Sequence, residues 1–281
     1  MTEEQFENCK QCLNRKKGVN EKESICNIKG KSMKFENTCR DFDLDKNVVL
    51  GTKNKIDAIR PNLKRAKLAQ LFIWIVMVLD IISIFSSYLQ YNLLKSLQNN
   101  EVVTGQMLNS NDTREQIIGV LYIIIYIISA VIFIQWFRRA YYNLNIRTNC
   151  NHSEGWAAGS WFVPIISWFR PYQIMKEMWN KTADLINSKT SGYAVNSTLI
   201  IGLWWSLWVL SNYIGKYVLK SAFKAETIEN FINNTIGDVA ISILGIPLAI
   251  LTVMIIKSYS LKEEKISELE RMENYKPVLA K

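Results

Sequence analysis

The chain of 281 residues contains four long runs of apolar residues with few charges inside them. The runs cover about residues 68–94, 117–137, 198–219 and 236–256. A helix needs about 20 apolar residues to cross the hydrocarbon core of a bilayer, and each run reaches that length. A helix also satisfies its backbone hydrogen bonds internally, which lipid cannot do for it. The pattern therefore predicts an all-α membrane protein with four transmembrane helices.

A fifth apolar run, at the centre of the chain, is too short to cross a membrane alone. It lies within residues 156–180 and is interrupted by Arg170 and Pro171. Proline is favoured in the first turn of a helix, so Pro171 predicts a new helix. Apolar residues such as Ile174 and Met178 then recur on one helical face. We expect a short re-entrant or interfacial helical element between spans two and three, with its amphipathic part along the membrane surface.

The net charge of +9 is distributed around the apolar runs. Basic residues gather in the linker 51–67, in the central segment 138–197, and in and around the tail 261–281. Lys and Arg are enriched on the cytoplasmic side of membrane proteins. We therefore expect both termini and the central segment in the cytoplasm and the protein in the inner membrane. Lys216, Lys220 and Lys224 would lie on the opposite side and count against this orientation, although lysines at the end of a helix can extend to the interface.

The charge distribution also limits the partners of the protein. A basic excess that flanks membrane segments is explained by lipid headgroups and topology, so the bilayer is the expected partner and nucleic acid is not. Residues 1–8 are polar and acidic and do not resemble a signal peptide.

Residues 1–50 form a polar, Cys-rich module. Cys9 and Cys12 form a C-x2-C pair, and Cys26 and Cys39 follow. Such a pair presents two thiolates from one turn, and two more would complete a tetrahedral zinc shell. A redox pair and structural disulfides are alternatives, although a reducing compartment argues against disulfides. We expect a Zn²⁺ ion to stabilise this module, which has few apolar side chains for a core and would be available to a protein partner.

Asp80 is the ionisable residue well inside a predicted span, which makes it a candidate polar or ion site. Counting residues from the cytoplasmic end of each span places one polar side chain of each other span at similar depth, as a candidate hydrogen-bond partner of Asp80: Tyr126, Ser211 or Asn212, and Ser242. A carboxyl group that only fixes helix packing is the alternative, and the lack of a buried Lys or Arg nearby favours it.

Three arginines are candidates for a contact with a lipid phosphate or another anion. Arg138 and Arg139 follow the second span, and Arg170 interrupts the central apolar run. Guanidinium groups bind phosphates and carboxylates bidentately. An interfacial anchor is the alternative role for each of them.

The chain lacks the residue sets of common membrane enzymes. It has one histidine, and it contains no HExxH, GxSxG or glycine-rich phosphate loop. We therefore expect no enzymatic activity.

Two segments resemble the bacterial membrane family known as domain of unknown function 4328. They are WFRRAYYNL, residues 136–144, and GWAAGSWFVPIISWFRPYQIMKEMW, residues 155–179. The matching residues are Trp136, Arg139, Ala140, Tyr141, Asn143 and Leu144 in the first segment, and Trp156, Trp161, Phe162, Pro164, Arg170, Pro171, Tyr172, Gln173 and Trp179 in the second. The resemblance extends over about residues 65–260. It implies the four-span fold with a short central element, and it implies no activity.

Two functions remain open from the sequence. The first is a non-enzymatic scaffold, adaptor or sensor whose zinc-stabilised module lies in the cytoplasm. The second is a small transporter or channel that uses Asp80 and the broken segment around Pro164. A water-filled cavity joining Asp80 to the short element would favour the second function, and a dry, fully packed bundle would favour the first.

Overall fold

The computed structural model describes residues 6, 9–16, 25–28, 39–43, 45, 58–190 and 197–275. The chain divides into two compact units, Met1–Arg60 and Pro61–Lys281. The described part of the second unit contains helices and no strand. Its elements are α3 (Leu63–Gln98), α4 (Gly105–Arg147), α5 (Glu154–Gly159), the short 3₁₀ helix η1 (Ile166–Trp168), α6 (Arg170–Lys189), α7 (Leu199–Ala222) and α8 (Ile228–Tyr275).

Three of the described helices, α3, α4 and α8, are long and apolar enough to cross a membrane. This agrees with an all-α, multi-pass membrane protein. The third predicted span corresponds to α7, which is not among these three. Three tryptophans and Asn212 lower its apolar character, and Trp prefers the membrane interface to the hydrocarbon core. The four-span arrangement is therefore not confirmed.

Helices α4 and α8 extend far beyond their apolar runs. α8 has 48 residues, which is about 72 Å of helix against a hydrocarbon core of about 30 Å. It includes the predicted fourth span and most of the predicted tail in one continuous helix. α4 begins after Thr104, whose side chain accepts a hydrogen bond from the Met107 amide and so caps the helix.

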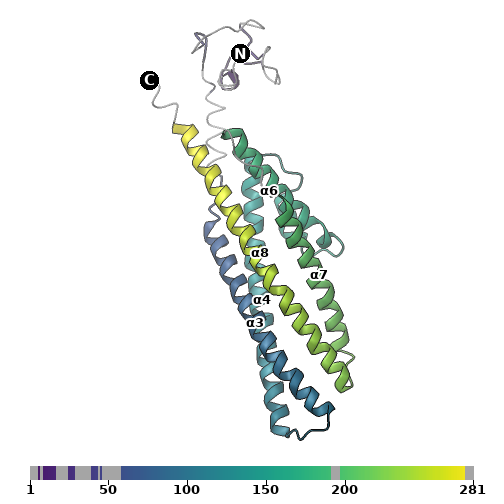
Figure 1. The fold of residues 1–281 in the computed structure, drawn as a ribbon. Helices are drawn as coiled ribbons and strands as arrows, with labels where there is room; N and C mark the ends of the chain where they lie inside the picture. The colour runs from purple at the N-terminus through teal and green to yellow at the C-terminus, as the bar shows by residue number, and fades with distance from the viewer. Residues whose placement is uncertain are drawn as a thin grey trace. The chain divides into compact units, whose positions relative to one another are not determined.

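The long helices pack in an antiparallel bundle (Figure 1). α8 packs along both α3 and α7, and α3 also packs against α4. The α3–α4 and α7–α8 connections, residues 99–104 and 223–227, lie at the same end of the bundle. The opposite end holds an aromatic core in which Trp136, Tyr141 and Tyr259 are almost fully buried.

The central element consists of α5, a turn, η1 and α6. The expected apolar face of α6 exists, but it packs in the protein core, where Ile174, Met175 and Met178 have no exposed surface. A re-entrant or interfacial position of this element is not confirmed. Glu177, a charged residue of the same helix, is buried as well.

The turn between α5 and η1 carries large apolar side chains at the surface. Phe162 is 73 % exposed and Ile165 is 77 % exposed. Ile165 has φ 67°, a left-handed conformation that is rare for a β-branched residue. Arg170 begins α6, one residue before the predicted start at Pro171.

Candidate functional site

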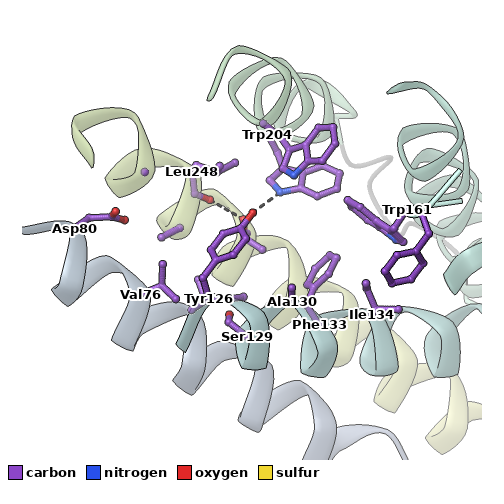
Figure 2. Close-up of a pocket in the computed structure, with 16 residues that line it drawn as sticks. Val76, Asp80, Tyr126, Ser129, Ala130, Phe133, Ile134, Trp161, Trp204 and Leu248 are labelled. Atoms are coloured by element: carbon purple, nitrogen blue, oxygen red, sulfur yellow. Dashed lines mark hydrogen bonds between the residues drawn. The ribbon is translucent and has the colours of Figure 1, made fainter. Parts of the chain in front are cut away.

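A pocket of about 300 Å³ lies inside the helical unit, between α3, α4, α7, α8 and the turn after α5 (Figure 2). Asp80 lies at one end of the pocket and Trp161 at the other. The lining residues are Ile73, Val76, Asp80, Tyr126, Ser129, Ala130, Phe133, Ile134, Trp161, Phe162, Trp204, Trp208, Gly245, Leu248, Ala249 and Thr252. Most of these side chains are apolar, which is typical of a pocket for a small organic molecule.

Asp80 is 2 % exposed and belongs to the middle of α3. Its Oδ1 accepts a hydrogen bond from the Tyr122 hydroxyl at 3.0 Å. Tyr122 stacks on Tyr126 with ring centroids 6.2 Å apart. In the described part of the chain, no Lys, Arg or His forms an ion pair with Asp80. The carboxyl group therefore has a neutral partner and no positive one.

The hydrogen-bond partner of Asp80 differs from the residues predicted by depth. Tyr122 lies one helical turn before Tyr126, and Tyr126 lines the pocket instead. The Asn212 side chain donates to the Trp208 carbonyl within its own helix.

Gly245 leaves space for the Asp80 carboxyl group. A Cβ atom built on Gly245 would lie 2.5 Å from Asp80 Oδ2 and 2.9 Å from its Cγ, which is closer than atoms can approach. In the sequence, Gly245 lies two residues before Pro247 within the predicted fourth span. The role of Gly245 depends on a neighbouring helix, so no local signal reveals it.

The other end of the pocket is aromatic. The Trp161 ring makes edge contacts with Phe133 and Trp208, each with ring centroids 5.6 Å apart. The indole N–H of Trp204 donates to Thr252 Oγ1 at 3.0 Å, and that hydroxyl donates to the Leu248 carbonyl. The indole N–H of Trp161 is buried without an acceptor in the described part of the molecule. Trp161 and Phe162 both come from the predicted short element, so the pocket connects that element to Asp80.

Two of the residues that line the pocket also have exposed surface. Tyr126 is 49 % exposed and Phe162 is 73 % exposed, although both line the pocket. Tyr126 belongs to α4, one of the three described helices that are long and apolar enough to cross a membrane.

The three candidate arginines lie outside the pocket. Arg138 pairs with Glu154 at 3.2 Å on an exposed surface, and Arg139 is half-buried on the same helix. The Arg170 guanidinium contacts the His152 ring with an N–N distance of 2.9 Å and lies over the Trp156 ring. Burial lowers the pKa of His152, and the positive charge of Arg170 lowers it further. Both effects favour the neutral form of the imidazole.

A second polar cluster, which we did not predict, holds the loop before α5 to α6. Glu177 accepts hydrogen bonds from the Tyr141 hydroxyl, the Asn151 amide and the Lys181 ammonium, all at 2.7 Å. Burial alone would raise the pKa of Glu177, but these donors outweigh it and lower the pKa. Burial of Cys150 and the charge of Glu177 raise the pKa of the Cys150 thiol to about 11.

The four predicted zinc ligands belong to the first unit. Cys9, Cys12 and Cys26 are buried and Cys39 is partly buried. Burial raises the pKa of the Cys9 thiol, and the other three thiols raise it further because they are close enough to repel a thiolate. Among the described residues, however, no group of three or more His, Cys, Asp or Glu side chains is placed to hold a metal ion. Zinc binding stays a prediction.

Comparison with known proteins identifies one family. The family described as "Domain of unknown function (DUF4328)" matches residues 99–260. This is more than half of the chain and extends from α4 through most of α8. The comparisons with curated proteins and with solved structures gave no match.

Proposed function

The chain belongs to the DUF4328 family, and we propose that its membrane domain binds a small molecule from the bilayer in the pocket between Asp80 and Trp161. The family assigns no activity, so the proposal depends on the geometry of this chain. The observation that carries it is the pocket itself, which joins the intramembrane carboxyl group to the short central element. A protein with a purely structural role would be expected to fill such a space with side chains.

The proposed role is binding without chemistry, in a sensor or a transporter. The titratable groups that line the pocket are Asp80 and Tyr126, and neither is paired with a nucleophile. The hydroxyl of Thr252 is occupied within its own helix. Nucleophilic and acid–base catalysis both require such groups within hydrogen-bond reach of each other. The pocket therefore supports recognition of a ligand better than its conversion.

The proposal includes a topology in which α7 is a fourth span. Both helix connections at one end of the bundle are short, which suits α3–α4 and α7–α8 as two transmembrane hairpins. In this arrangement the N-terminal unit, the central element and the end of α8 share the cytoplasmic side of the inner membrane, where Lys and Arg are favoured. The turn at Phe162 and Ile165 would contact lipid as an interfacial or re-entrant segment.

A second candidate role, that of a cytoplasmic adaptor, depends on the N-terminal unit. Cys12 Sγ accepts a hydrogen bond from the Asp43 amide at 3.4 Å, a contact that stabilises a thiolate. Four neighbouring thiols repel one another as thiolates, and a divalent cation would remove that repulsion. Metal analysis of the full-length protein, purified without chelator, would test this. About one zinc per chain that is lost in Cys9→Ser supports the role, and metal-free wild type contradicts it.

The test of pocket binding uses 4-phenylbutan-1-ol, a neutral probe with an aromatic ring, and the full-length protein in lipid nanodiscs. Calorimetry would measure saturable binding to wild type and to Ala130→Phe, in which a larger side chain fills the pocket. Ala222→Phe makes the same change at an exposed position near the end of α7 and serves as the control. We expect Ala130→Phe to weaken binding at least tenfold and Ala222→Phe to leave it unchanged. Equal binding by all three proteins would contradict the proposal.

A further inference from the structure

Asp80 makes one end of the pocket chemically different from the rest. A carboxylate offers about four lone-pair sites for hydrogen bonds. The Tyr122 hydroxyl uses one of them, on Oδ1. Oδ2 lies beside Gly245, which has no side chain to donate a hydrogen bond or to cover the oxygen. The carboxyl group thus retains acceptor capacity at the wall of the pocket.

The surroundings of Asp80 do not compensate a negative charge. The residue is 2 % exposed, and no Lys, Arg or His in the described ranges pairs with it. An isolated charge at this depth is costly, and such residues face a partner or a cavity. A ligand that carries a positive charge would supply the missing partner, and its own charge would be neutralised by the same contact.

The remainder of the pocket suits the body of such a ligand. Phe133, Trp204 and Trp208 present aromatic rings, which attract apolar groups and, by their faces, cations. The lining residues of α4 run from Tyr126 to Ile134, a rise of about 12 Å along the helix. This length accommodates a small molecule with a charged head at one end and an aromatic ring or a short alkyl chain at the other.

We propose that the pocket binds an organic ammonium ion, with the ammonium group on Asp80 and an aromatic or alkyl body against the tryptophans. This inference rests on the proposed function and adds the chemical class of its ligand. The ammonium group donates hydrogen bonds to Oδ2 and completes an ion pair that the protein lacks by itself. The body replaces lipid or water against Trp204 and Trp208. An uncharged molecule of the same shape makes only the second set of contacts.

The experiment compares 4-phenylbutylamine, which is charged at pH 7, with its neutral counterpart 4-phenylbutan-1-ol. Both are titrated into the full-length protein in nanodiscs of zwitterionic lipid. The part of the binding that Ala130→Phe removes is assigned to the pocket. Asp80→Asn removes the charge and keeps the shape of the side chain. Asp184→Asn makes the same change on the exposed surface of α6 and is the control.

We expect wild type and Asp184→Asn to bind the amine at least tenfold more tightly than the alcohol, and Asp80→Asn to bind both equally. Equal binding of the two compounds to wild type, still blocked by Ala130→Phe, would overturn the inference and leave the proposed function intact. Binding that Ala130→Phe does not block would overturn both. If Asp80→Asn fails to fold, the comparison of the two compounds on wild type still tests the inference, because it requires no change at Asp80.

Discussion

The substitution Gly245→Ala tests whether α8 must have no side chain beside Asp80. The added Cβ would lie 2.5 Å from Asp80 Oδ2, so one of two groups has to move. Either the carboxyl group rotates and loses the hydrogen bond from Tyr122, or α8 moves away from α3. Both changes act on the acidic end of the pocket.

The expected magnitude follows from the two alternatives. A lost hydrogen bond to a charged group costs about 1.5–3 kcal/mol, and overpacking of a core costs about 1–3 kcal/mol. Alanine favours a helix over glycine by up to about 1 kcal/mol, which offsets part of that cost. We therefore expect Gly245→Ala to lower the free energy of unfolding by about 1–2 kcal/mol.

Unfolding in one detergent, followed by circular dichroism, would measure this difference. Gly119→Ala in α4 is the matched control, because its Cβ would meet nothing within 4 Å, and it should not destabilise the protein. In an Asp80→Ala background, Gly245→Ala should become neutral or stabilising, since the clashing atoms are gone. If Gly245→Ala is equally destabilising in both backgrounds, the clash is not with Asp80 and the reasoning fails.

Three further predictions concern the polar contacts and the topology. Glu177→Gln should lower the free energy of unfolding by about 1–3 kcal/mol. The pKa of Glu177 in the folded protein is lowered from 4.5, so the carboxylate stabilises the fold above pH 4.5 and this stabilisation is lost as the pH falls through the folded pKa. The melting temperatures of wild type and Glu177→Gln should therefore converge in acid. Glu270→Ala should cost up to about 3–5 kcal/mol because the buried Arg147, 3.0 Å away, loses its ion pair and keeps only its hydrogen bond to Ser267 Oγ and the charge of Glu263, whereas the double variant Arg147→Met, Glu270→Leu should be close to wild type in denaturant unfolding. In cells, a membrane-impermeant thiol reagent should label Val102→Cys and not Asp184→Cys, and labelling of both from outside would contradict the proposed topology.

The fold could be predicted where length alone decides. An apolar run long enough to cross a bilayer leaves a helix as the one economical solution, and α3, α4 and α8 followed. Amphipathicity was less informative. The sequence of α6 has the same pattern whether its apolar face meets lipid or protein, and in the structure Met175 and Met178 meet α4 and α8. Only the neighbouring helices distinguish the two environments.

The candidate site could be predicted in part for a related reason. Asp80 was identified because a carboxyl group within a span is costly wherever it points. Its partner was not identified, because counting residues gives depth along a helix but not rotation about its axis. Tyr122 and Tyr126 are four residues apart on one face, and packing selects the first as the donor. Glu177 was missed because two of its three donors, Tyr141 and Asn151, come from α4 and from the loop before α5.

The two motif segments and the lining of the pocket differ in how they relate to the family match. Motif residues such as Trp136, Ala140 and Tyr141 are fully buried and hold α4 against its neighbours. The matched region, residues 99–260, supplies the aromatic wall of the pocket and Gly245. Asp80 lies on α3, outside that region. Most of the lining of the pocket therefore lies within the matched region, whereas its carboxyl group comes from a helix outside that region.

A family member with an apolar residue at the position of Asp80 should retain the pocket and bind the neutral probe without preferring the amine. Such a protein would test the two proposals separately, because it has the pocket without the carboxyl group. If it prefers the amine, a residue other than Asp80 binds the ammonium group.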